Sequence, residues 1–377
     1  MHELFLKLTD FCFRITIGGE FGGEAAVTDR MAALHALAAR LPAWYASHAR
    51  DLPWRQDREP YHVWLSEIML QQTRVEAVKG YYTRFLAAVP DIPALAAADP
   101  ELLRKLWEGL GYYSRVRNLQ AAARQIMDEH GGVFPTACSA VRALKGVGDY
   151  TAGAICSICF DLPTPAVDGN VLRVLSRLTL DHRCIDDPAV KRAVRDELTA
   201  VYPQTGAGTL TQALMELGAT VCLPNGAPRC EVCPMRELCA AARDGLWTGC
   251  PVRAKKAPRR VEELTVFALS CGGKLALRQR PEQGLLAGLW ELPNVPGRLD
   301  AQAALDLAAG WGVEPRNLVK QLEREHIFTH IVWHMRCWYL ECAAEAPAFV
   351  WADETALDRK YALPTAFRMF RAEAPGD

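Results

Sequence analysis

The stretch LKGVGDYTAGAI, from Leu144 to Ile155, contains the turn that decides the fold of the first two thirds of the chain. Gly146 and Gly148 flank one valine between two helical patterns, and glycines there permit a tight turn with positive φ. The next helix would begin with free backbone N–H groups that can hold a phosphate. The pattern predicts a helix–hairpin–helix, which binds the DNA backbone without reading its sequence. An ordinary turn between two helices is the alternative.

Helical patterns continue on both sides of this turn. Apolar residues recur at three- and four-residue spacing in VWLSEIMLQQTRVEAVKGYYTRFL and in PELLRKLWEGLGYYSRVRNLQAAARQIMDEH. We therefore expect an all-α domain over residues 31–242. Residues 1–30 are Gly-rich and weakly patterned, so we expect an extension that is disordered or lies upstream of a start at Met31. Residues 243–261 include RAKKAPRR and predict a basic linker.

The pattern changes at Glu262. The stretch ELTVFALSCGGKLALRQR predicts two strands joined by a Cys-Gly-Gly turn, and AQAALDLAAGWGV predicts one helix. The stretch HIFTHIVWHMRCWYLEC alternates like a strand. Residues 262–377 are therefore expected to form an α+β domain.

Four of the thirteen cysteines cluster in CLPNGAPRCEVCPMRELC, at Cys222, Cys230, Cys233 and Cys239. Four thiolates in one short segment can enclose a zinc ion or an iron–sulfur cluster. The middle pair forms a C-x-x-C clip, but the second clip of a zinc ribbon is missing, and a proline follows the third cysteine. These features favour a 4Fe–4S cluster, with four buried apolar cysteines as the alternative.

Two acidic residues stand out within these helical patterns. Glu67 lies among apolar residues in WLSEIMLQQTRV, and Asp168 precedes a helical run in AVDGNVLRVLSRL. Taken alone, Glu67 would face solvent and Asp168 would be a helix N-cap. Burial of an acid favours its protonated form, which suits a general acid. A proton donor and an anion that stabilises an oxocarbenium ion are the groups needed to break a glycosidic bond.

These motifs occur in one order together with LPWR and GLGYYSRVRNL. In this order the chain resembles the adenine DNA glycosylases of the MutY type, in the helix–hairpin–helix superfamily. The resemblance implies that Glu67 protonates adenine at N7 and that Asp168 supports the oxocarbenium ion at the sugar. It also implies that Tyr150 and Asn170 shape the pocket for these groups.

The resemblance further implies that Gln72 and Tyr112 enter the base stack where adenine is flipped out, and that Arg55 contacts the DNA. Core packing is the alternative for Tyr112. The sequence departs from the family at Lys145, where proline is usual, and at Asp149, which places a negative charge near the expected phosphate. The first gap between the clustered cysteines is also one residue longer than usual.

In the C-terminal region, GLLAGLWELP resembles the start of a Nudix fold. A Nudix hydrolase needs several acidic Mg²⁺ ligands on one helix, and the corresponding stretch offers only Asp306. The resemblance instead implies a module that recognises 8-oxoguanine opposite adenine through Phe328, Thr329 and His330. A core strand with incidental polar residues is the alternative for this loop.

The resemblance thus implies a multidomain protein: an all-α helix–hairpin–helix glycosylase with an iron–sulfur cluster loop, followed by an α+β Nudix-like domain. It would hydrolytically remove adenine mispaired with 8-oxoguanine or guanine, with one 4Fe–4S cluster and no nucleotide cofactor. The alternative enzyme is a bifunctional glycosylase and lyase of the endonuclease III type. Such a lyase needs a lysine to form a Schiff base, and Tyr150 occupies the position of that lysine.

The charge is distributed unevenly along the chain, so a local basic surface rather than the overall net charge would bind an acidic partner. The formal net charge is −1, but residues 1–260 hold 31 Lys and Arg against 28 acidic residues, whereas residues 261–377 hold 12 against 16. A local basic surface in the first part is compatible with double-stranded DNA as partner. The sequence contains no run of 18 apolar residues, so we expect no membrane helix. Its thirteen cysteines show no disulfide framework, which predicts a reducing compartment. We therefore expect a cytoplasmic monomer that acts at the nucleoid.

Overall fold

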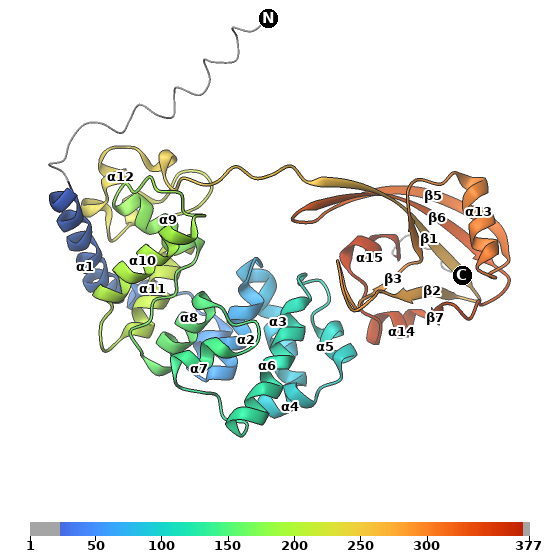
Figure 1. Ribbon diagram of the computed structural model, residues 1–377, viewed down its shortest axis with the longest axis horizontal. Helices are drawn as coiled ribbons and strands as arrows, with labels where there is room; N and C mark the ends of the chain where they lie inside the picture. The colour runs from blue at the N-terminus through green and yellow to red at the C-terminus, as the bar shows by residue number, and fades with distance from the viewer. Residues whose placement is uncertain (1–22, 372–377) are drawn as a thin grey trace, which may run out of the picture. The chain divides into compact units, whose positions relative to one another are not determined.

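The computed structural model of the protein describes residues 23–371 and divides into two compact units (Figure 1). One unit combines the chain up to Arg50 with Ala152–Ala254, and the other combines Asp51–Thr151 with Lys255–Asp377. The boundary passes through α8 (Asp149–Phe160), so the helical region expected as one domain over 31–242 is divided between the units. None of the described helices is long and apolar enough to span a membrane.

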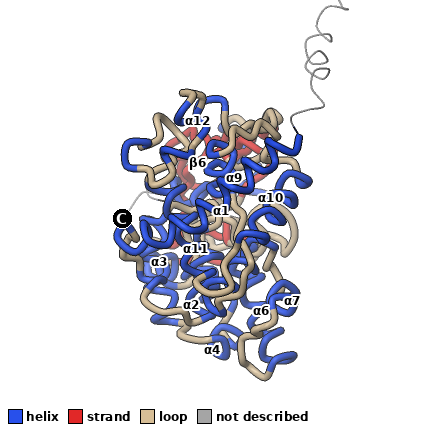
Figure 2. The backbone as a smooth tube through the Cα atoms, turned by 90° about the vertical axis from the view of Figure 1, so that its left-hand side faces the viewer, coloured by secondary structure: helices blue, strands red, loops and turns tan. Residues whose placement is uncertain are grey.

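The first unit is helical and is built around one apolar core. Its long helices are α1 (Gly23–His48), α9 (Gly169–Leu178), α10 (Pro188–Val201) and α11 (Ala207–Thr220). They lie side by side and bury Leu37, Leu175 and Leu214 to 1% exposure or less (Figure 2). Short turns follow in η2 (Cys230–Val232), η3 (Arg236–Leu238), α12 (Ala240–Arg243) and η4 (Trp247–Gly249).

The expected boundaries of the extension and the linker both shift. Helix α1 begins at Gly23, and Arg30 binds the Glu197 carboxylate of α10 through Nε at 3.0 Å and Nη2 at 2.7 Å. Residues 23–30 therefore belong to the helical fold, whereas the rest of the expected extension lies outside the described residues. The expected linker is shorter than residues 243–261, because only 253–259 are exposed and without regular structure.

Among the described residues, the helical part of the second unit consists of seven helices, three of which start at an acidic N-cap. They are η1 (Pro53–Arg55), α2 (Pro60–Leu70), α3 (Val75–Ala88), α4 (Ile92–Ala97), α5 (Pro100–Leu106), α6 (Ser114–His130) and α7 (Cys138–Ala143). Asp91 and Asp99 each accept a backbone N–H at the start of α4 and α5, and proline occupies an early position in both helices. Phe85 and Trp107 pack edge to face in the interior, with ring centroids 5.9 Å apart.

The C-terminal part of the second unit is a mixed sheet with helices on both faces. Its elements are β1 (Arg260–Cys271), β2 (Lys274–Gln279), β3 (Trp290–Glu291), β4 (Asn294–Pro296), α13 (Ala301–Gly310), β5 (Pro315–Ile327), β6 (Ile331–Cys342), β7 (Val350–Ala352), α14 (Glu354–Arg359) and α15 (Thr365–Arg371). The main strand order is β3-β2-β1-β6-β5, with β1 parallel to β6. Alternate residues of β1 enter different cores, since Val266 packs with α15 and Phe267 packs with α13.

The structure confirms most of the pattern predicted here and corrects one stretch. The two strands with a Cys-Gly-Gly turn are β1 and β2, and Gly272 and Gly273 take the positive φ values of 54° and 72° that a tight hairpin needs. The predicted helix is α13. The stretch expected as one strand over 326–342 is instead the end of β5, a turn at Phe328–His330, and β6.

Candidate active site and nucleic-acid interface

The Glu67 carboxyl group is buried and hydrogen-bonded. Glu67 lies near the end of α2 and is 6% exposed, which rejects the solvent-facing position expected from its local sequence. The hydroxyl of Tyr150 donates to Oε2 of Glu67 over 2.8 Å, from the first turn of α8 just after the hairpin. The fold therefore brings together two residues 83 positions apart, and a buried acid is fixed in orientation by a phenol.

The Asp168 carboxylate caps helix α9 and belongs, with Asn170, to the other unit. Its Oδ1 accepts the backbone N–H groups of Asn170 at 2.9 Å and Val171 at 2.8 Å, and its Oδ2 accepts the Asn170 side-chain amide at 2.7 Å. Burial raises the pKa of Asp168, although these three hydrogen bonds act in the opposite direction. The residue is thus both the expected N-cap and a partly buried anion.

A chain of polar contacts runs from Asp168 to the cysteine segment along α9. Arg173 donates from Nη2 to Oδ1 of Asn170 at 2.9 Å and from Nε to the Cys222 carbonyl at 2.9 Å. One turn further, Arg177 donates to the Leu223 carbonyl at 2.8 Å and approaches Cys222 Sγ at 3.4 Å. Both arginines are 4% exposed, so helix α9 is tied to the cysteine segment through buried contacts.

All four clustered cysteines line one small cavity in the first unit, beside Arg177. Burial and the neighbouring thiols raise the pKa of Cys233 to about 11, which keeps its sulfur protonated at neutral pH. Among residues 23–371, no three His, Cys, Asp or Glu side chains are already gathered as ligands of one ion. The donor set of four soft thiols fits a zinc ion or an iron–sulfur cluster, and binding would deprotonate the thiols and draw them together.

The longer first gap between the cysteines is accommodated at the surface. Residues 224–227 are exposed, and Gly226 has a φ of +74°. The Arg229 N–H donates to the Val221 carbonyl at 2.9 Å and closes the loop behind them. The extra residue therefore extends towards solvent and leaves the cysteines on one cavity.

The hairpin lies between the end of α7 at Ala143 and the start of α8 at Asp149. Gly146 has a φ of +78°, and a Cβ there would lie 2.7 Å from the Asn118 Cβ, so glycine is required. Gly148 was expected to need the same freedom, but it has no positive φ and faces open space. Asp149 forms an ion pair with Arg142 at 2.6 Å, which partly offsets the negative charge near the hairpin.

The two expected wedge residues share an unusual backbone conformation. Gln72 follows α2 and Tyr112 follows α5, and both are exposed non-glycine residues with positive φ, at 58° and 47°. Tyr112 is 45% exposed, which rejects core packing. Arg55, the other expected DNA contact, is half-buried in η1. Side chains held in this way outside the core can meet a ligand at the surface.

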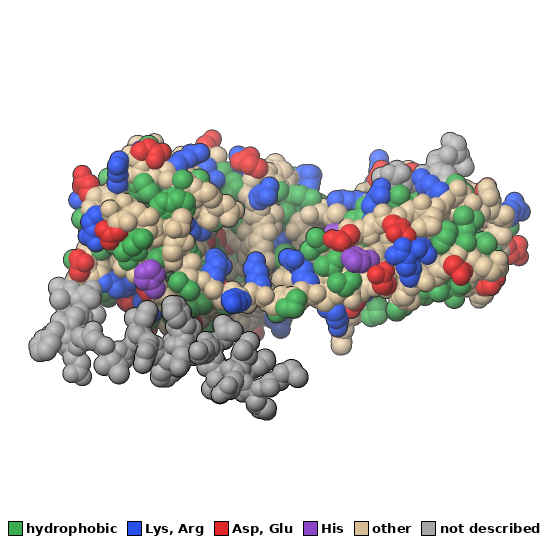
Figure 3. Space-filling model, turned by 90° about the horizontal axis from the view of Figure 1, so that it is seen from above, with side chains coloured by type: hydrophobic (Ala, Val, Ile, Leu, Met, Phe, Trp, Pro, Cys, Tyr) green, Lys and Arg blue, Asp and Glu red, His purple; other side chains and the backbone are tan. Residues whose placement is uncertain are grey.

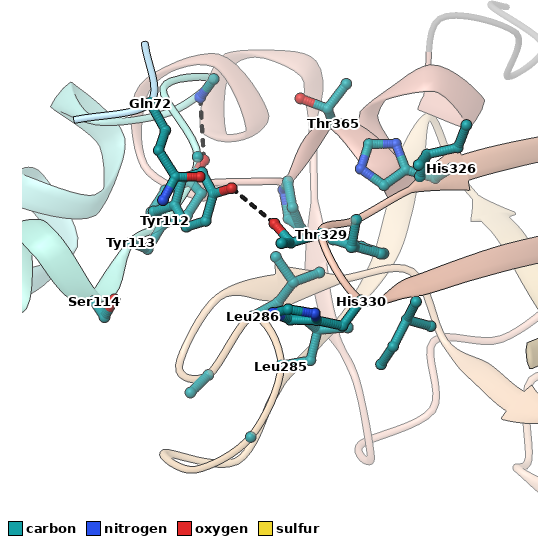
Figure 4. A pocket seen from close by; sticks show the side chains of 18 of the residues that line it. Gln72, Tyr112, Tyr113, Ser114, Leu285, Leu286, His326, Thr329, His330 and Thr365 are labelled. Atoms are coloured by element: carbon teal, nitrogen blue, oxygen red, sulfur yellow. Dashed lines mark hydrogen bonds between the residues drawn. The ribbon is translucent and has the colours of Figure 1, made fainter. Parts of the chain in front are cut away.

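Gln72 and Tyr112 line a cavity of about 710 Å³ within the second unit, together with the Phe328–His330 turn (Figure 4). The hydroxyls of Tyr112 and Thr329 lie 2.8 Å apart and form a hydrogen bond. The Phe328 ring packs edge to face against Trp333, with centroids 4.8 Å apart, whereas His330 is exposed. The turn therefore combines one anchored ring with two exposed polar side chains.

Acidic and basic side chains are interspersed on the face seen in Figure 3. Residues 253–259 add an exposed basic segment. DNA binding would thus depend on local hydrogen-bond donors, such as backbone N–H groups at the hairpin, rather than on a strong electrostatic field of the whole protein.

The comparisons with known proteins agree with both parts of the fold. Residues 65–199 match the HhH-GPD superfamily of base excision DNA repair proteins, and residues 265–373 match the NUDIX domain. The chain is 37% identical over 366 residues to an adenine DNA glycosylase of Rattus norvegicus, covering 82% of this chain and 71% of the relative. It is 34% identical over 409 residues to the adenine DNA glycosylase of Homo sapiens, covering 89% and 74%.

A solved structure shares the fold. A thermostable thymine-DNA glycosylase aligns with a TM-score of 0.51 at 24% sequence identity, covering 58% of this chain and 99% of that one. Together with the sequence relatives, this confirms the expected helix–hairpin–helix glycosylase fold followed by a Nudix-like domain. The chain belongs to the adenine DNA glycosylases, enzymes of base-excision repair.

Proposed function

We propose that this glycosylase hydrolytically removes adenine paired with 8-oxoguanine or guanine in double-stranded DNA, and that it leaves the strand uncut. The observation that carries the proposal is the buried Glu67 held by Tyr150 at 2.8 Å. A lyase of the endonuclease III type would need an amine at the position of Tyr150 to form a Schiff base. A phenol there supports simple hydrolysis.

Glu67 acts as the general acid in this proposal. The Glu67 carboxyl group carries a proton to N7 of a flipped adenine, while the Tyr150 hydroxyl donates to its Oε2 and fixes the orientation of the group. Protonation makes the base a better leaving group as the glycosidic bond breaks. Burial in α2 supports this role, because it holds the carboxyl group in one orientation and away from bulk water.

Asp168 stabilises the positive charge that develops on the sugar. Its carboxylate is oriented by Asn170 and by two backbone N–H groups, so it needs little rearrangement when the charge appears. Burial raises its pKa, which means that the free carboxylate is poorly solvated and gains from a nearby cation. The Asn170 and Arg173 contacts hold this geometry.

Cys222, Cys230, Cys233 and Cys239 would hold one 4Fe–4S cluster. Such a cluster supplies four metal–thiolate bonds that order a short cysteine segment. In this chain the segment is attached to α9 through Arg173 and Arg177, so its order supports the helix that carries Asp168.

Recognition of the base opposite adenine is assigned to the Phe328–His330 turn with Gln72 and Tyr112. Flipping out adenine costs a few kcal/mol, and adenine is a normal base, so the partner base must be read as well. The cavity beside this turn offers aromatic surface, hydroxyls and an amide, which suit a wedge and hydrogen bonds to 8-oxoguanine. The twelve cysteines of the described part form no disulfide, which supports the further proposal of a reducing cytoplasmic location.

Borohydride trapping combined with a free-base assay tests this proposal. Duplexes with adenine opposite 8-oxoguanine and with an oxidised pyrimidine are incubated with enzyme, and released base and covalent adducts are measured separately. The proposal predicts free adenine, an intact abasic strand and almost no trapped adduct. Efficient trapping on the pyrimidine duplex without adenine release would favour the lyase instead.

A further inference from the structure

Arg115 is a buried cation whose partners are backbone carbonyls rather than carboxylates. It lies in the first turn of α6 and is 8% exposed. Its Nη1 donates to three carbonyls, those of Ile68 at 2.7 Å, Met69 at 3.0 Å and Gln71 at 2.7 Å. Its Nη2 donates to the carbonyls of Leu110 at 3.1 Å and Gly111 at 3.0 Å. One guanidinium thus joins the end of α2 to the loop before α6.

Two of these carbonyls lie directly before the expected wedge residues, Gln72 and Tyr112. The Gln71 carbonyl belongs to the peptide group just before Gln72, and the Gly111 carbonyl belongs to the peptide group just before Tyr112. The plane of the preceding peptide helps to define the φ angle of the next residue. The Arg115 backbone N–H also donates to the Tyr112 carbonyl at 2.9 Å. Arg115 therefore acts on the backbone on both sides of Tyr112 and directly before Gln72.

Both wedge residues need such support. Non-glycine residues rarely adopt positive φ, and the surrounding structure must stabilise that conformation. Gln72 and Tyr112 adopt it at 58° and 47° on two loops that are 40 positions apart in the sequence. The Arg115 guanidinium also lies 5.6 Å from the centroid of the Tyr112 ring. The contacts of Arg115 are thus made to the two loops that carry Gln72 and Tyr112.

We infer that Arg115 is a positioning residue that sets Gln72 and Tyr112 for base flipping before DNA binds. This inference rests on the proposed function, since it assigns the residue to the step that extrudes adenine. Burial lowers the pKa of Arg115 to about 10, so the cation persists at neutral pH. Lysine would keep the charge but cannot reproduce the planar fork that reaches both loops.

Comparison of stacked and unstacked adenine tests this inference. Arg115→Lys and Arg115→Met are assayed by single-turnover adenine release from a duplex with adenine opposite 8-oxoguanine, and from a duplex with adenine in an unpaired bulge. Both variants should be at least thirty-fold slower than wild type on the paired adenine. They should be within about three-fold of wild type on the bulge, because that base needs little extrusion. With 2-aminopurine at the adenine position, the fluorescence increase on binding should also be lost.

Arg124→Met is the matched control, since Arg124 lies on the same helix, is exposed and donates only from Nε to the Ala96 carbonyl at 3.0 Å. It should behave as wild type on both substrates. Equal losses by Arg115→Lys on the paired and bulged adenine, with or without a lower melting temperature, would show a general structural role and overturn the inference. Absence of adenine release by the wild-type enzyme on both substrates would instead reject the proposed function.

Discussion

Asp168→Asn separates the charge of this residue from the helix cap that it forms. Asparagine can still accept the backbone N–H groups of Asn170 and Val171, so α9 should keep its first turn. The variant loses the negative charge that would face the oxocarbenium ion. Two unit charges roughly 4 Å apart at an effective dielectric constant of about 20 interact by about 4 kcal/mol. The rate of adenine release should therefore fall about a thousand-fold.

The same variant makes a prediction about stability and pH. Burial raises the pKa of Asp168, so its charged form costs folding free energy above that pKa, and the cost disappears as the pH falls through it. Asparagine removes this titration, but its amide would face the Asn170 amide that now donates to Oδ2, at a cost of about 1 kcal/mol. The melting temperature of the variant relative to wild type should therefore decrease as the pH falls through the raised pKa of Asp168.

Single-turnover kinetics and thermal melting check both parts. Adenine release is measured with enzyme in excess, and binding to the same duplex is measured separately to show that affinity is retained. A rate within ten-fold of wild type would refute the role of the charge. If the melting temperature of Asp168→Asn relative to wild type instead increases as the pH falls, burial does not cause the raised pKa of Asp168.

Other variants test the remaining assignments. Glu67→Gln can still accept the Tyr150 hydroxyl, so it should melt within about 2 °C of wild type while adenine release falls about 10²- to 10⁴-fold; a single-turnover rate near wild type would remove Glu67 as the acid. Cys233→Ser should lower the iron content per chain and the melting temperature, whereas Cys156→Ala, at a buried position outside the cluster, should leave iron unchanged by metal analysis. Thr329→Val removes the hydroxyl that meets Tyr112 and should reduce the preference for 8-oxoguanine over guanine opposite adenine several-fold; an unchanged ratio of the two rates would place lesion reading elsewhere.

Local patterns explain what could be predicted from the sequence. The cysteine segment, the glycine turn and the β1–β2 hairpin are each contained in at most twenty residues, and their chemistry or spacing is visible without the fold. Strand β5 was missed because its alternation is masked by charged residues, as is common for an exposed edge strand. The division of the helical region inside α8 depends on long-range packing and has no local signal.

Some properties of the site residues depend on contacts that are distant in the sequence and therefore have no local signal. The buried Glu67 carboxyl group is hydrogen-bonded by Tyr150, which is 83 residues away, whereas the local pattern around Glu67 favours solvent. Arg115 carries no recognisable signal, because an arginine on an amphipathic helix is normally exposed and its partners here are main-chain carbonyls. The resemblance supplied Gln72 and Tyr112, but only the backbone angles reveal that both need to be held in place.

Chromatographic identification of the released base under single-turnover conditions shows whether the enzyme hydrolyses the bond to adenine and reads the opposite base. Three duplexes that differ only in the base opposite one adenine are compared: 8-oxoguanine, guanine and thymine. We expect free adenine with an intact abasic strand from the first two duplexes, faster with 8-oxoguanine, and almost none from the thymine duplex. Equal adenine release from all three, or strand scission without free adenine, would contradict this expectation.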